Sequence, residues 1–493
     1  MRLTKLTEGI GETVCEKTEK EQDISSLCID SRLAKKGDLF FCLTGGNQDG
    51  HNFALDAVKK GAVALVVERV LPISVPQILV SNTRIALAKI AARFYGNPEE
   101  RLKIIGITGT NGKTTTSYML QAILEKANKK VGVIGTLGVS CLHTVVSSPL
   151  TTPDPIELYK TLAEMFLKGV EYVVMEVSAH ALYYHKVYGI AFTACIFTNC
   201  TQDHLDFFKD MQSYQDTKTT LFHTDVCPIA VLNGDDETGR KIGELRKENG
   251  TETLYYGLQT PTDAFAVVTH ESLDKTECLF NVNDKLCRVR LALVGKHNVY
   301  NALAAATCAV ALKIELSPIA KGLCDLQGVC GRLQRVETYN GAEIFVDFAH
   351  TPDGLAQSIQ TLKPHCKGRL VCLFGCGGNR DKSKRSVMGE TAAKLCDFCI
   401  ITSDNPRYED PMDIIAEIER GYRRFSMRYV IVPERESAIR YAIEFLKAGD
   451  ILLVAGKGGE RYQEIMGIKY PFDDNDIIEK IIREKGNGSI PIR

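Results

Sequence analysis

The stretch LKIIGITGTNGKTTTSYMLQAILEKA, residues 102–127, combines an apolar run, a glycine turn and an amphipathic pattern. This order predicts a buried strand, a tight turn and a helix. Further strand-sized apolar runs lie at 131–136, 172–178 and 192–199, with a helical pattern such as 156–169 between them. Strands that alternate with helices predict an α/β fold, in which helices cover both faces of a parallel sheet.

The turn in this stretch has the composition of a phosphate-binding loop. It contains Gly109, Thr110, Asn111, Gly112, Lys113, Thr114 and Thr115. Glycines let the backbone approach a phosphate, and the helix N-terminus presents free N–H groups and a positive dipole. Lys113 adds a charge for the β- and γ-phosphates, and the two threonine hydroxyls can reach Mg²⁺. The general GxxxxGK[ST] pattern is not met, because Ile107 stands where it requires glycine. A glycine turn that merely ends a strand stays open as an alternative.

The pattern on either side of this stretch predicts three α/β domains. Residues 1–98 alternate short apolar runs with helical patterns, and Gly96-Asn97-Pro98 is a strong chain breaker. Residues 225–290 are more β-like, and we assign no site to them. After Gly331-Arg332 the alternation of strands and helices restarts, and each strand ends in a Gly- or Asp-rich loop. The predicted domains are 1–98, 99–331 and 332–493.

The composition is that of an ordinary soluble protein. Apolar residues make up 44% of the chain, charged residues 25%, and the net charge is −1. This charge gives no electrostatic reason to expect a nucleic acid or an anionic membrane as partner. No apolar run resembles a signal peptide or could span a bilayer, so we expect a cytoplasmic protein without membrane insertion.

The seventeen cysteines show no disulfide-like framework. In a chain without export signals, such cysteines are expected to be reduced and buried. Cys396 and Cys399, with Cys372 and Cys376 nearby in sequence, leave a structural zinc site open as an alternative to buried thiols.

Acidic and basic residues follow several of the predicted strands. Glu176 ends the run at 172–178, Asp203-His204 follows the run at 192–199, and Lys218 lies on a helical stretch farther on. A carboxylate and a neutral imidazole beside a triphosphate would suit Mg²⁺. Each residue alone has an ordinary structural explanation. Their shared position on loops after parallel strands is what favours a functional interpretation.

Several segments occur in the order found in one enzyme family, so the chain resembles the Mur ligases, and within them the MurE type, over nearly its whole length. The segments are DSRLAKKGDLFFCLTGGNQDGH (30–51), GTNGKTT (109–115), EVSAHAL (176–182), TNCTQDHLDFF (198–208), YQDTKTTLF (214–222), GKHNVYNALAA (295–305), CGRLQRVE (330–337), VDFAHTPDGL (346–355), GCGGNRDKSKR (375–385), DNPR (404–407) and AGKGGERYQ (455–463).

The resemblance implies an ATP-dependent ligase of peptidoglycan precursor synthesis. ATP would phosphorylate the D-Glu carboxylate of UDP-N-acetylmuramoyl-L-Ala-D-Glu, and the amine of an incoming amino acid would attack the acyl phosphate. Mg²⁺ and cationic groups would neutralise the charge at the phosphoryl group. It also implies a monomer with a small N-terminal α/β UDP-binding domain, a central P-loop-type ATPase domain with a parallel sheet, and a C-terminal Rossmann-like domain that binds the amino acid.

The resemblance further implies a role for individual residues. The implied catalytic residues are Lys113, Glu176, His204 and Lys218. The implied metal ligands are Thr114, Glu176, His204 and Lys218, the last as a carbamate. ATP contacts are implied for the loop 109–115, Asn301, Arg332 and Asp347, with His350 beside Asp347 at a domain junction. Contacts to the UDP-sugar peptide are implied for Ser31, Gly46, Asn47, Gln48, Thr151, Thr152, Ser178 and Lys186. Lys186 stands where an arginine is expected and loses its bidentate geometry, and Tyr184 replaces a more usual polar amide.

The motif Asp404-Asn405-Pro406-Arg407 bears on which amino acid is added. In this family it accompanies meso-diaminopimelate, whose distal carboxylate a guanidinium can bind bidentately. Lysine has no carboxylate there and would leave Arg407 unpaired. Arg380, Gly456 and Glu460 match the remaining amino-acid contacts, Glu460 suiting the distal ammonium, while Gly459 replaces a more usual histidine. Taken alone, the motif favours an Asn-Pro turn with a solvent-facing arginine, and its place in the series of family segments is what favours the functional interpretation.

Other functions stay open at this point. One is the same ligation with L-lysine as the third residue. A second is a nucleotide-dependent binding protein that has lost catalysis, although Lys113, Glu176, His204 and Lys218 are all present. A third is a related ligase, such as a folylpolyglutamate synthetase or the enzyme that adds D-Ala-D-Ala. The segment 30–51 and the DNPR motif argue against this third possibility.

Overall fold

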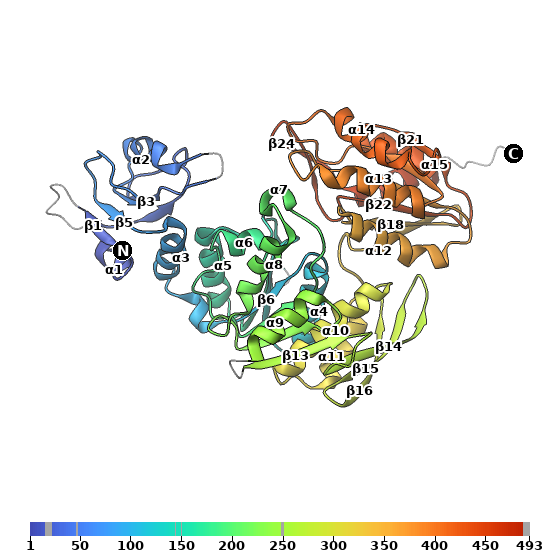
Figure 1. The fold of residues 1–493 in the computed structure, drawn as a ribbon, viewed down its shortest axis with the longest axis horizontal. Helices are drawn as coiled ribbons and strands as arrows, with labels where there is room; N and C mark the ends of the chain where they lie inside the picture. Colours follow the sequence, from blue (N-terminus) through green and yellow to red (C-terminus); the bar gives the residue numbers. More distant parts are fainter. Residues whose placement is uncertain (15–21, 46–47, 143, 149, 248–250, 487–493) are drawn as a thin grey trace. The chain divides into compact units, whose positions relative to one another are not determined.

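The computed structural model describes residues 1–14, 22–45, 48–142, 144–148, 150–247 and 251–486 (Figure 1). Gly46 and Asn47, two of the predicted contacts to the UDP-sugar peptide, lie outside the described residues. The chain divides into two compact units. The first unit contains Met1–Thr108, Lys129–Cys195 and Thr217–Ala230, and the second contains Gly109–Asn128, Ile196–Asp216 and Val231–Arg493.

The first unit begins with a small sheet in the order β1-β5-β4-β3-β2, in which β1 alone is antiparallel to its neighbour. The strands are β1 (Glu12–Val14), β2 (Ser26–Cys28), β3 (Asp38–Phe41), β4 (Ala64–Val67) and β5 (Gln77–Leu79), and the helices are α1 (Leu3–Thr7), α2 (Ala54–Lys59) and α3 (Thr83–Phe94). Phe40, Leu65 and Val67 of the sheet pack with Ala54 and Ala57 of α2 in one buried cluster. The helix α3 ends at the predicted position, since Gly96 and Asn97 follow it with φ of 82° and 48°.

A second set of strands in the first unit follows the order β6-β10-β7-β8-β9. These strands are β6 (Lys103–Thr108), β7 (Val131–Gly135), β8 (Gly138–Cys141), β9 (Thr144–Val146) and β10 (Tyr172–Glu176), with helices α5 (Pro155–Leu167) and α6 (Ala179–Tyr183). β10 pairs in parallel with both β6 and β7. Its register places Glu176 beside Ile107, so the carboxylate stands at the carboxyl end of the strands.

The second unit contains the helix that follows the glycine turn. α4 (Lys113–Lys126) packs against α10 (Lys296–Ala311) and α11 (Leu316–Asp325). The predicted β-rich stretch forms β13 (Glu252–Gly257), β14 (Ala264–Glu271), β15 (Thr276–Val282) and β16 (Lys285–Leu291), hydrogen-bonded in that order, and two further helices are α7 (Leu205–Phe208) and α9 (Glu237–Lys247). The chain passes between the units within β11 (Ala194–Phe197), α8 (Met211–Thr219) and β12 (Ile229–Asn233).

The rest of the second unit is built on a sheet in the order β17-β18-β22-β19-β20-β21, in which β17 alone is antiparallel. The strands are β17 (Gln334–Tyr339), β18 (Ala342–Asp347), β19 (Leu370–Phe374), β20 (Phe398–Ile401), β21 (Tyr429–Ile431) and β22 (Ile451–Ala455). The helices are α12 (Pro352–Leu362), α13 (Ser383–Leu395), α14 (Pro411–Tyr422), α15 (Arg435–Phe445) and α16 (Asp474–Gly486). A separate hairpin consists of β23 (Tyr462–Ile465) and β24 (Ile468–Pro471). Among the described residues, 3₁₀ turns span Gly50–Phe53, Pro98–Arg101, Thr220–Phe222 and Lys363–His365.

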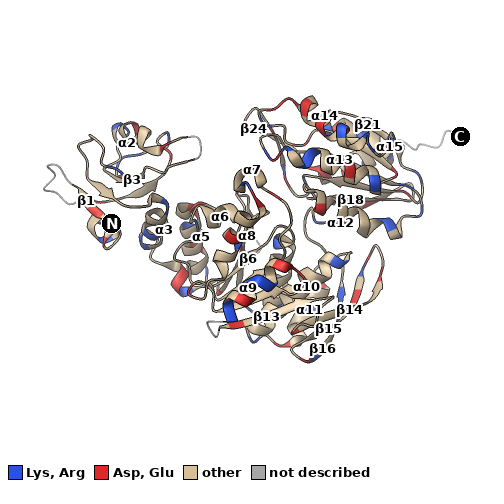
Figure 2. Ribbon diagram, viewed as in Figure 1, with Lys and Arg blue, Asp and Glu red and all other residues tan. Residues whose placement is uncertain are grey.

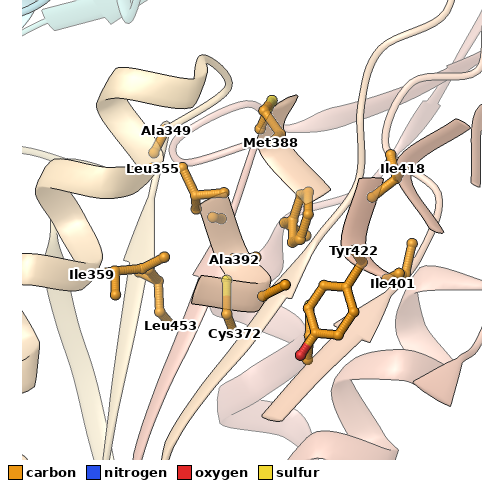
Figure 3. Close-up of a cluster of buried hydrophobic side chains, with 14 of the residues drawn as sticks. Ala349, Leu355, Ile359, Cys372, Met388, Ala392, Ile401, Ile418, Tyr422 and Leu453 are labelled. Carbon is orange, nitrogen blue, oxygen red and sulfur yellow. The ribbon is translucent and has the colours of Figure 1, made fainter. Parts of the chain in front are cut away.

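Helices cover both faces of this sheet. On one face α12, α13 and α14 bury Leu355, Met388 and Tyr422 against Cys372 and Leu453 (Figure 3). On the other face α15 and α16 pack against the alternate strand residues. Because successive side chains of a strand point to opposite faces, a continuous apolar strand supplies both cores. This layered arrangement is the Rossmann-like architecture that the sequence predicted.

Charged groups are spread over both units, with acidic and basic side chains interspersed on the helices and loops (Figure 2). Within the described part of the chain, no helix combines the length and the apolar character needed to cross a bilayer. The cysteines described are free, and the thiols of Cys396 and Cys399 lie near that of Cys372. Burial raises the pKa of Cys376 to about 12 and also raises that of Cys399, which favours neutral thiols over metal-binding thiolates.

Replacing Arg435 by methionine is expected to lower the free energy of unfolding by about 3–5 kcal/mol. Arg435 of α15 donates to both carboxylate oxygens of Asp474 on α16, at 2.8 and 2.7 Å, and both side chains are fully buried. The variant therefore leaves a buried carboxylate without its cation. Urea denaturation would measure the loss. Arg440→Ala, also on α15, breaks an exposed pair with Glu484 of α16 and should leave stability nearly unchanged. Equal losses for the two variants would contradict the prediction.

Candidate functional site

The turn after β6 has the backbone conformation that a phosphate-binding loop requires. Gly109 and Gly112 have φ of 149° and 87°, where glycine is favoured. Gly112 caps the N-terminus of α4, and a Cβ at that position would collide with the Asn301 side chain. Bare glycine backbone therefore leads into the first turn of the helix, whose N–H groups have no partner within the helix itself.

The Lys113 side chain lies over its own loop, and neighbouring residues hold that loop in place. Its Nζ donates to the carbonyls of Gly109 and Thr110 at 2.7 and 2.9 Å. Asn199 Oδ1 accepts from the Asn111 N–H at 2.9 Å. Asn199 is not among the predicted site residues, although its place directly after a strand is a signal in the sequence.

Two residues predicted to contact the nucleotide lie beside this loop. Asn301 on α10 occupies the space that a side chain at Gly112 would need. Arg332 Nη2 donates to the Thr114 hydroxyl at 2.8 Å, and its guanidinium lies 4.5 Å from the centre of the Phe348 ring. The structure therefore brings a second cation to the start of α4, although Arg332 is far from the loop in sequence.

Asp347, also predicted to contact ATP, ends β18 and organises the loop after it. Its carboxylate accepts from the Leu333 N–H at 2.6 Å, the Ala349 N–H at 2.9 Å and the Ser358 hydroxyl at 2.9 Å. Asp353, at the start of α12, accepts from the side-chain amide of Asn111 at 3.1 Å. The predicted junction around Asp347 therefore contacts the glycine loop through a residue that sequence analysis did not assign.

Asp203 lies near three basic side chains in the second unit. Its carboxylate is 3.3 Å from His204 Nε2 and 3.9 Å from both His350 Nε2 and Lys384 Nζ. Burial would raise the pKa of Asp203, but these three groups lower it to about 2, so the carboxylate is ionised. Asp203 is predicted only as the neighbour of His204, and Lys384 is not among the predicted site residues because its partner is remote in sequence.

The first unit positions Glu176, the predicted metal ligand, at the end of β10. Its side chain is fully buried. Oε1 accepts from the Thr136 N–H at 2.9 Å, and Oε2 accepts from the Thr136 hydroxyl at 3.1 Å. That hydroxyl also lies 3.1 Å from the hydroxyl of Thr151, a predicted contact to the UDP-sugar peptide. A Cβ at Gly135 would collide with the carboxylate, which explains the glycine there.

Three other predicted sugar-peptide contacts, Thr152, Ser178 and Lys186, lie near the end of β10. The Thr152 hydroxyl donates to the Glu176 carbonyl at 2.8 Å and accepts from the Ser178 N–H at 3.1 Å. Lys186 pairs with Asp154 at 2.9 Å and donates to the Thr152 carbonyl at 3.4 Å. The structure therefore gathers these hydroxyls and one ammonium group around Thr152, next to the end of β10.

Four more predicted or noted residues of the first unit have distinct surroundings. Lys218, on α8, is 1% exposed, which is unusual for a lysine. The Ser31 carbonyl accepts from Lys60 Nζ at 3.0 Å, and the Gln48 carbonyl accepts from the Gly45 N–H. Tyr184 stands where the family more usually has a polar amide. The Arg84 guanidinium lies 4.3 Å from the centre of the Tyr184 ring, so this position makes a cation–π contact.

Two predicted amino-acid contacts, Asn405 and Glu460, are joined by hydrogen bonds in the second unit. Asn405 donates to Glu460 at 2.9 Å, and Lys457 Nζ donates to the Asn405 side-chain oxygen at 3.1 Å. A Cβ at Gly456 would lie 2.5 Å from the Asp404 carboxylate. Burial and the charge of Asp404 raise the pKa of Glu460, so a cation beside Glu460 would be favoured. Lys457 belongs to a segment that sequence analysis quoted without assigning this residue.

The two arginines of the predicted amino-acid site lie near each other. Arg407 has φ of 52° and is 15% exposed in its side chain. Burial lowers the pKa of Arg380, and the charge of Arg407 lowers it further. A carboxylate bound between the two guanidinium groups would relieve this repulsion.

Glu409 supports the loop on which Arg380 lies, and its contribution to stability should depend on pH. A bidentate pair with Arg385 lowers the pKa of Glu409 from 4.5 to about 2 against the effect of burial. Glu409→Gln is therefore expected to lower the free energy of unfolding by about 2 kcal/mol at neutral pH. The folded pKa is the lower one, so this difference should persist above pH 4.5 and shrink as the pH falls toward 2. Denaturation curves at several pH values would check this, and a constant difference would contradict it.

Known protein families match consecutive parts of the chain. The family descriptions are "Mur ligase family, catalytic domain" for residues 23–95, "Mur ligase middle domain" for 107–309 and "Mur ligase, glutamate ligase domain" for 331–458. A UDP-N-acetylmuramoyl-L-alanyl-D-glutamate--2,6-diaminopimelate ligase of Caldanaerobacter subterraneus subsp. tengcongensis is 42% identical over 486 residues, which cover 98% of this chain and 99% of that protein. The chain belongs to the Mur ligase family.

Other Mur ligases are similar over comparable lengths. The enzyme of the same name from Clostridium botulinum is 42% identical over 473 residues, covering 94% of this chain and 96% of its own. A solved structure described as UDP-N-acetylmuramoyl-L-alanyl-D-glutamate--2,6-diaminopimelate ligase has a TM-score of 0.67 at 29% identity, and the match covers 96% of this chain and 98% of that one. The predicted family and the predicted three-domain α/β fold are thus confirmed. The domain boundaries at 98 and 331 stay predictions.

Proposed function

We propose that this Mur ligase joins meso-2,6-diaminopimelate to the D-Glu carboxylate of UDP-N-acetylmuramoyl-L-Ala-D-Glu, with conversion of ATP to ADP and phosphate. The observation that carries the proposal is the cluster of Arg407, Arg380 and Glu460, which offers cations for one carboxylate and a carboxylate for one ammonium. The two relatives at 42% identity, each named as a 2,6-diaminopimelate ligase, support the same substrate.

The reaction needs an activated carboxylate. The D-Glu carboxylate attacks the γ-phosphorus of ATP, which forms an acyl phosphate and releases ADP. The amine of diaminopimelate then attacks the acyl carbon, and inorganic phosphate leaves from the tetrahedral intermediate as the amine loses its proton. Lys113 and Arg332, both at the start of α4, supply positive charge where the phosphoryl group carries negative charge. Asn301 and Asp347 complete the proposed ATP contacts.

The donor types of the residues proposed to hold Mg²⁺ suit the chemistry of that ion. Mg²⁺ prefers one or two carboxylates together with phosphate oxygens and water. Glu176 offers a buried carboxylate, while Thr114 and His204 offer a hydroxyl and an imidazole. The ion would supply Lewis-acid stabilisation of the phosphoryl oxygens. Lys218 is proposed to react with CO₂ as a neutral amine, releasing a proton and forming a carbamate. Lys218 is only 1% exposed, so a group formed on it would lie away from bulk water, which supports this modification.

The remaining parts of the proposal concern the other substrate and the setting. Ser31, Gln48, Thr151, Thr152, Ser178 and Lys186, with Gly46 and Asn47 outside the described residues, are proposed to bind the UDP-sugar peptide. The division into residues 1–98, 99–331 and 332–493 is proposed to separate binding of the UDP-sugar, ATP and amino acid. We place the enzyme in the cytoplasm, where ATP is available, as a monomer without a nucleic acid partner or membrane insertion.

The decisive experiment measures phosphate release with ATP, Mg²⁺ and UDP-N-acetylmuramoyl-L-Ala-D-Glu, with meso-diaminopimelate and L-lysine offered in parallel. Turnover with meso-diaminopimelate alone, and a product of the corresponding mass, is the expected result. Turnover with lysine alone would keep the ligase and reject the proposed role of Arg407. Nucleotide binding without amino-acid-dependent phosphate release would favour the non-catalytic alternative.

A further inference from the structure

The hairpin of β23 and β24 pairs with the backbone of Arg407. The Arg407 N–H donates to the Glu464 carbonyl at 3.0 Å, and the Met466 N–H donates to the Arg407 carbonyl at 2.7 Å. Arg407 and Ile465 form the corresponding parallel bridge. Because Arg407 has φ of 52°, its backbone needs this support to hold a conformation that arginine rarely adopts.

The same hairpin also contacts the Arg407 side chain. Arg407 Nε donates to Glu464 Oε2 at 3.1 Å, and Nη1 donates to the Gly378 carbonyl at 2.9 Å. A Cβ at Gly377 would lie 2.9 Å from Nη1, so that glycine leaves room for the guanidinium. The two hydrogen bonds use two of the five N–H groups of a guanidinium and fix the orientation of its plane. The edge at Nη2 can then be offered to a carboxylate.

The ion pair between Arg407 and Glu464 is expected to be more stabilising than an ion pair on the protein surface. The side chains of Arg407 and Glu464 are only 15% and 20% exposed. The charge of Arg407 lowers the pKa of Arg380 and that of Glu464 opposes this effect. The charge of Asp206 opposes it as well, and a carboxylate from a ligand would further offset the repulsion between the two guanidinium groups.

Glu464 also connects the cationic end of the amino-acid site to its acidic end. Its backbone N–H donates to the Asn405 side-chain oxygen at 2.9 Å, and the Asn405 amide donates to Glu460 at 2.9 Å. The side chain of Glu464 thus orients Arg407 while its backbone is tied, through Asn405, to the group proposed for the distal ammonium. Movement of this one residue would change the spacing between the two ends.

We propose that Glu464 is a positioning residue that sets selectivity for an amino acid whose far end carries both a carboxylate and an ammonium group. This inference rests on the proposed function. Glu464 holds the Arg407 guanidinium at the angle and distance at which it binds the distal carboxylate. It acts through Arg407 and does not touch the reacting atoms.

The test compares wild type, Glu464→Ala and Glu464→Gln as full-length enzymes in steady-state kinetics with meso-diaminopimelate and with L-lysine. For Glu464→Ala, the KM for meso-diaminopimelate is expected to rise about tenfold or more, the size of a hydrogen bond to a charged group. We expect kcat and the KM values for ATP and the UDP-sugar peptide to change by less than about threefold. Glu464→Gln should recover part of the loss, because its amide oxygen can still accept from Nε.

A matched control and a double variant separate this role from a general structural one. Glu479→Ala removes the carboxylate of an exposed pair with Arg483 on α16 and should leave every kinetic constant unchanged. Adding Glu464→Ala to Arg407→Ala should cause little further loss with meso-diaminopimelate, since Glu464 acts through that arginine.

The outcomes that overturn the inference are distinct. An unchanged KM, or equal losses in all constants and in thermal stability, would reject a positioning role. A lower KM for meso-diaminopimelate would show that Glu464 competes with the substrate carboxylate, which also rejects it. If wild type fails to use meso-diaminopimelate, the proposed function falls first and takes this inference with it.

Discussion

Lys113→Ala is expected to lower the ligation rate by about a thousandfold, or about 4 kcal/mol of transition-state stabilisation. Lys113 is the cation that begins α4, and its Nζ lies over the loop carbonyls of Gly109 and Thr110. Alanine keeps the helix but removes the charge nearest to the proposed position of the β- and γ-phosphates. Phosphate release with all three substrates would measure the rate, and calorimetry would measure ATP binding.

The matched control is Lys126→Ala, in the last turn of the same helix. Lys126 is half-exposed and pairs with Asp325 at 2.6 Å. Its removal should leave the ligation rate unchanged while removing the same charge from the protein. If both variants lost activity equally, or if Lys113→Ala kept near-normal turnover, the glycine turn would have to be reinterpreted as a structural feature.

Arg407→Ala is expected to lower kcat/KM for meso-diaminopimelate by about a hundredfold or more, which is typical when a buried charged contact to the substrate is lost. The kcat/KM for L-lysine should fall much less, because lysine has no distal carboxylate. Arg407→Lys should be intermediate, since an ammonium keeps the charge but cannot bind a carboxylate bidentately. Parallel kinetics with the two amino acids give the ratio directly.

Arg423→Ala is the control for this prediction. Arg423 lies on the surface after α14, where it is 57% exposed and 3.7 Å from Glu419. We expect no change in the ratio of the two kcat/KM values for this variant. Equal losses with both amino acids in Arg407→Ala would show that the arginine maintains the loop and does not select the substrate.

The parts of the fold that the sequence predicted are those with a local cause. The apolar run and glycine turn at 102–127 gave β6 and α4 almost within their observed bounds, Lys103–Thr108 and Lys113–Lys126. Glycines determine the path of such a turn whatever the rest of the chain does. By contrast, a continuous apolar strand such as β19 does not reveal which residues face which helices.

The parts of the site that were missed depend on contacts between remote residues. Asn111 contacts Asp353, which lies 242 positions later in the sequence, and Asp203 lies near Lys384, which is also remote in sequence. Neither contact produces a periodic pattern in the sequence. Glu464 lies on a short exposed hairpin, where a glutamate is ordinarily a solvated residue. Only the fold shows that its backbone and side chain both meet Arg407. Residue type and spacing can therefore predict a role for Arg407 but not the contribution of Glu464.

The buried pair of Arg435 and Asp474 bears on the order in which the protein is completed during translation. Arg435 also donates to the carbonyls of Ser403 and Ala455, which directly precede the two loops of the proposed amino-acid site. During translation, Arg435 is added to the chain 39 residues earlier than Asp474. Until Asp474 leaves the ribosome, burying the Arg435 guanidinium is unfavourable because it has no carboxylate partner. The two loops therefore cannot adopt their folded conformation before then. The nascent enzyme should therefore gain its phosphate-binding loop well before it can hold an amino acid.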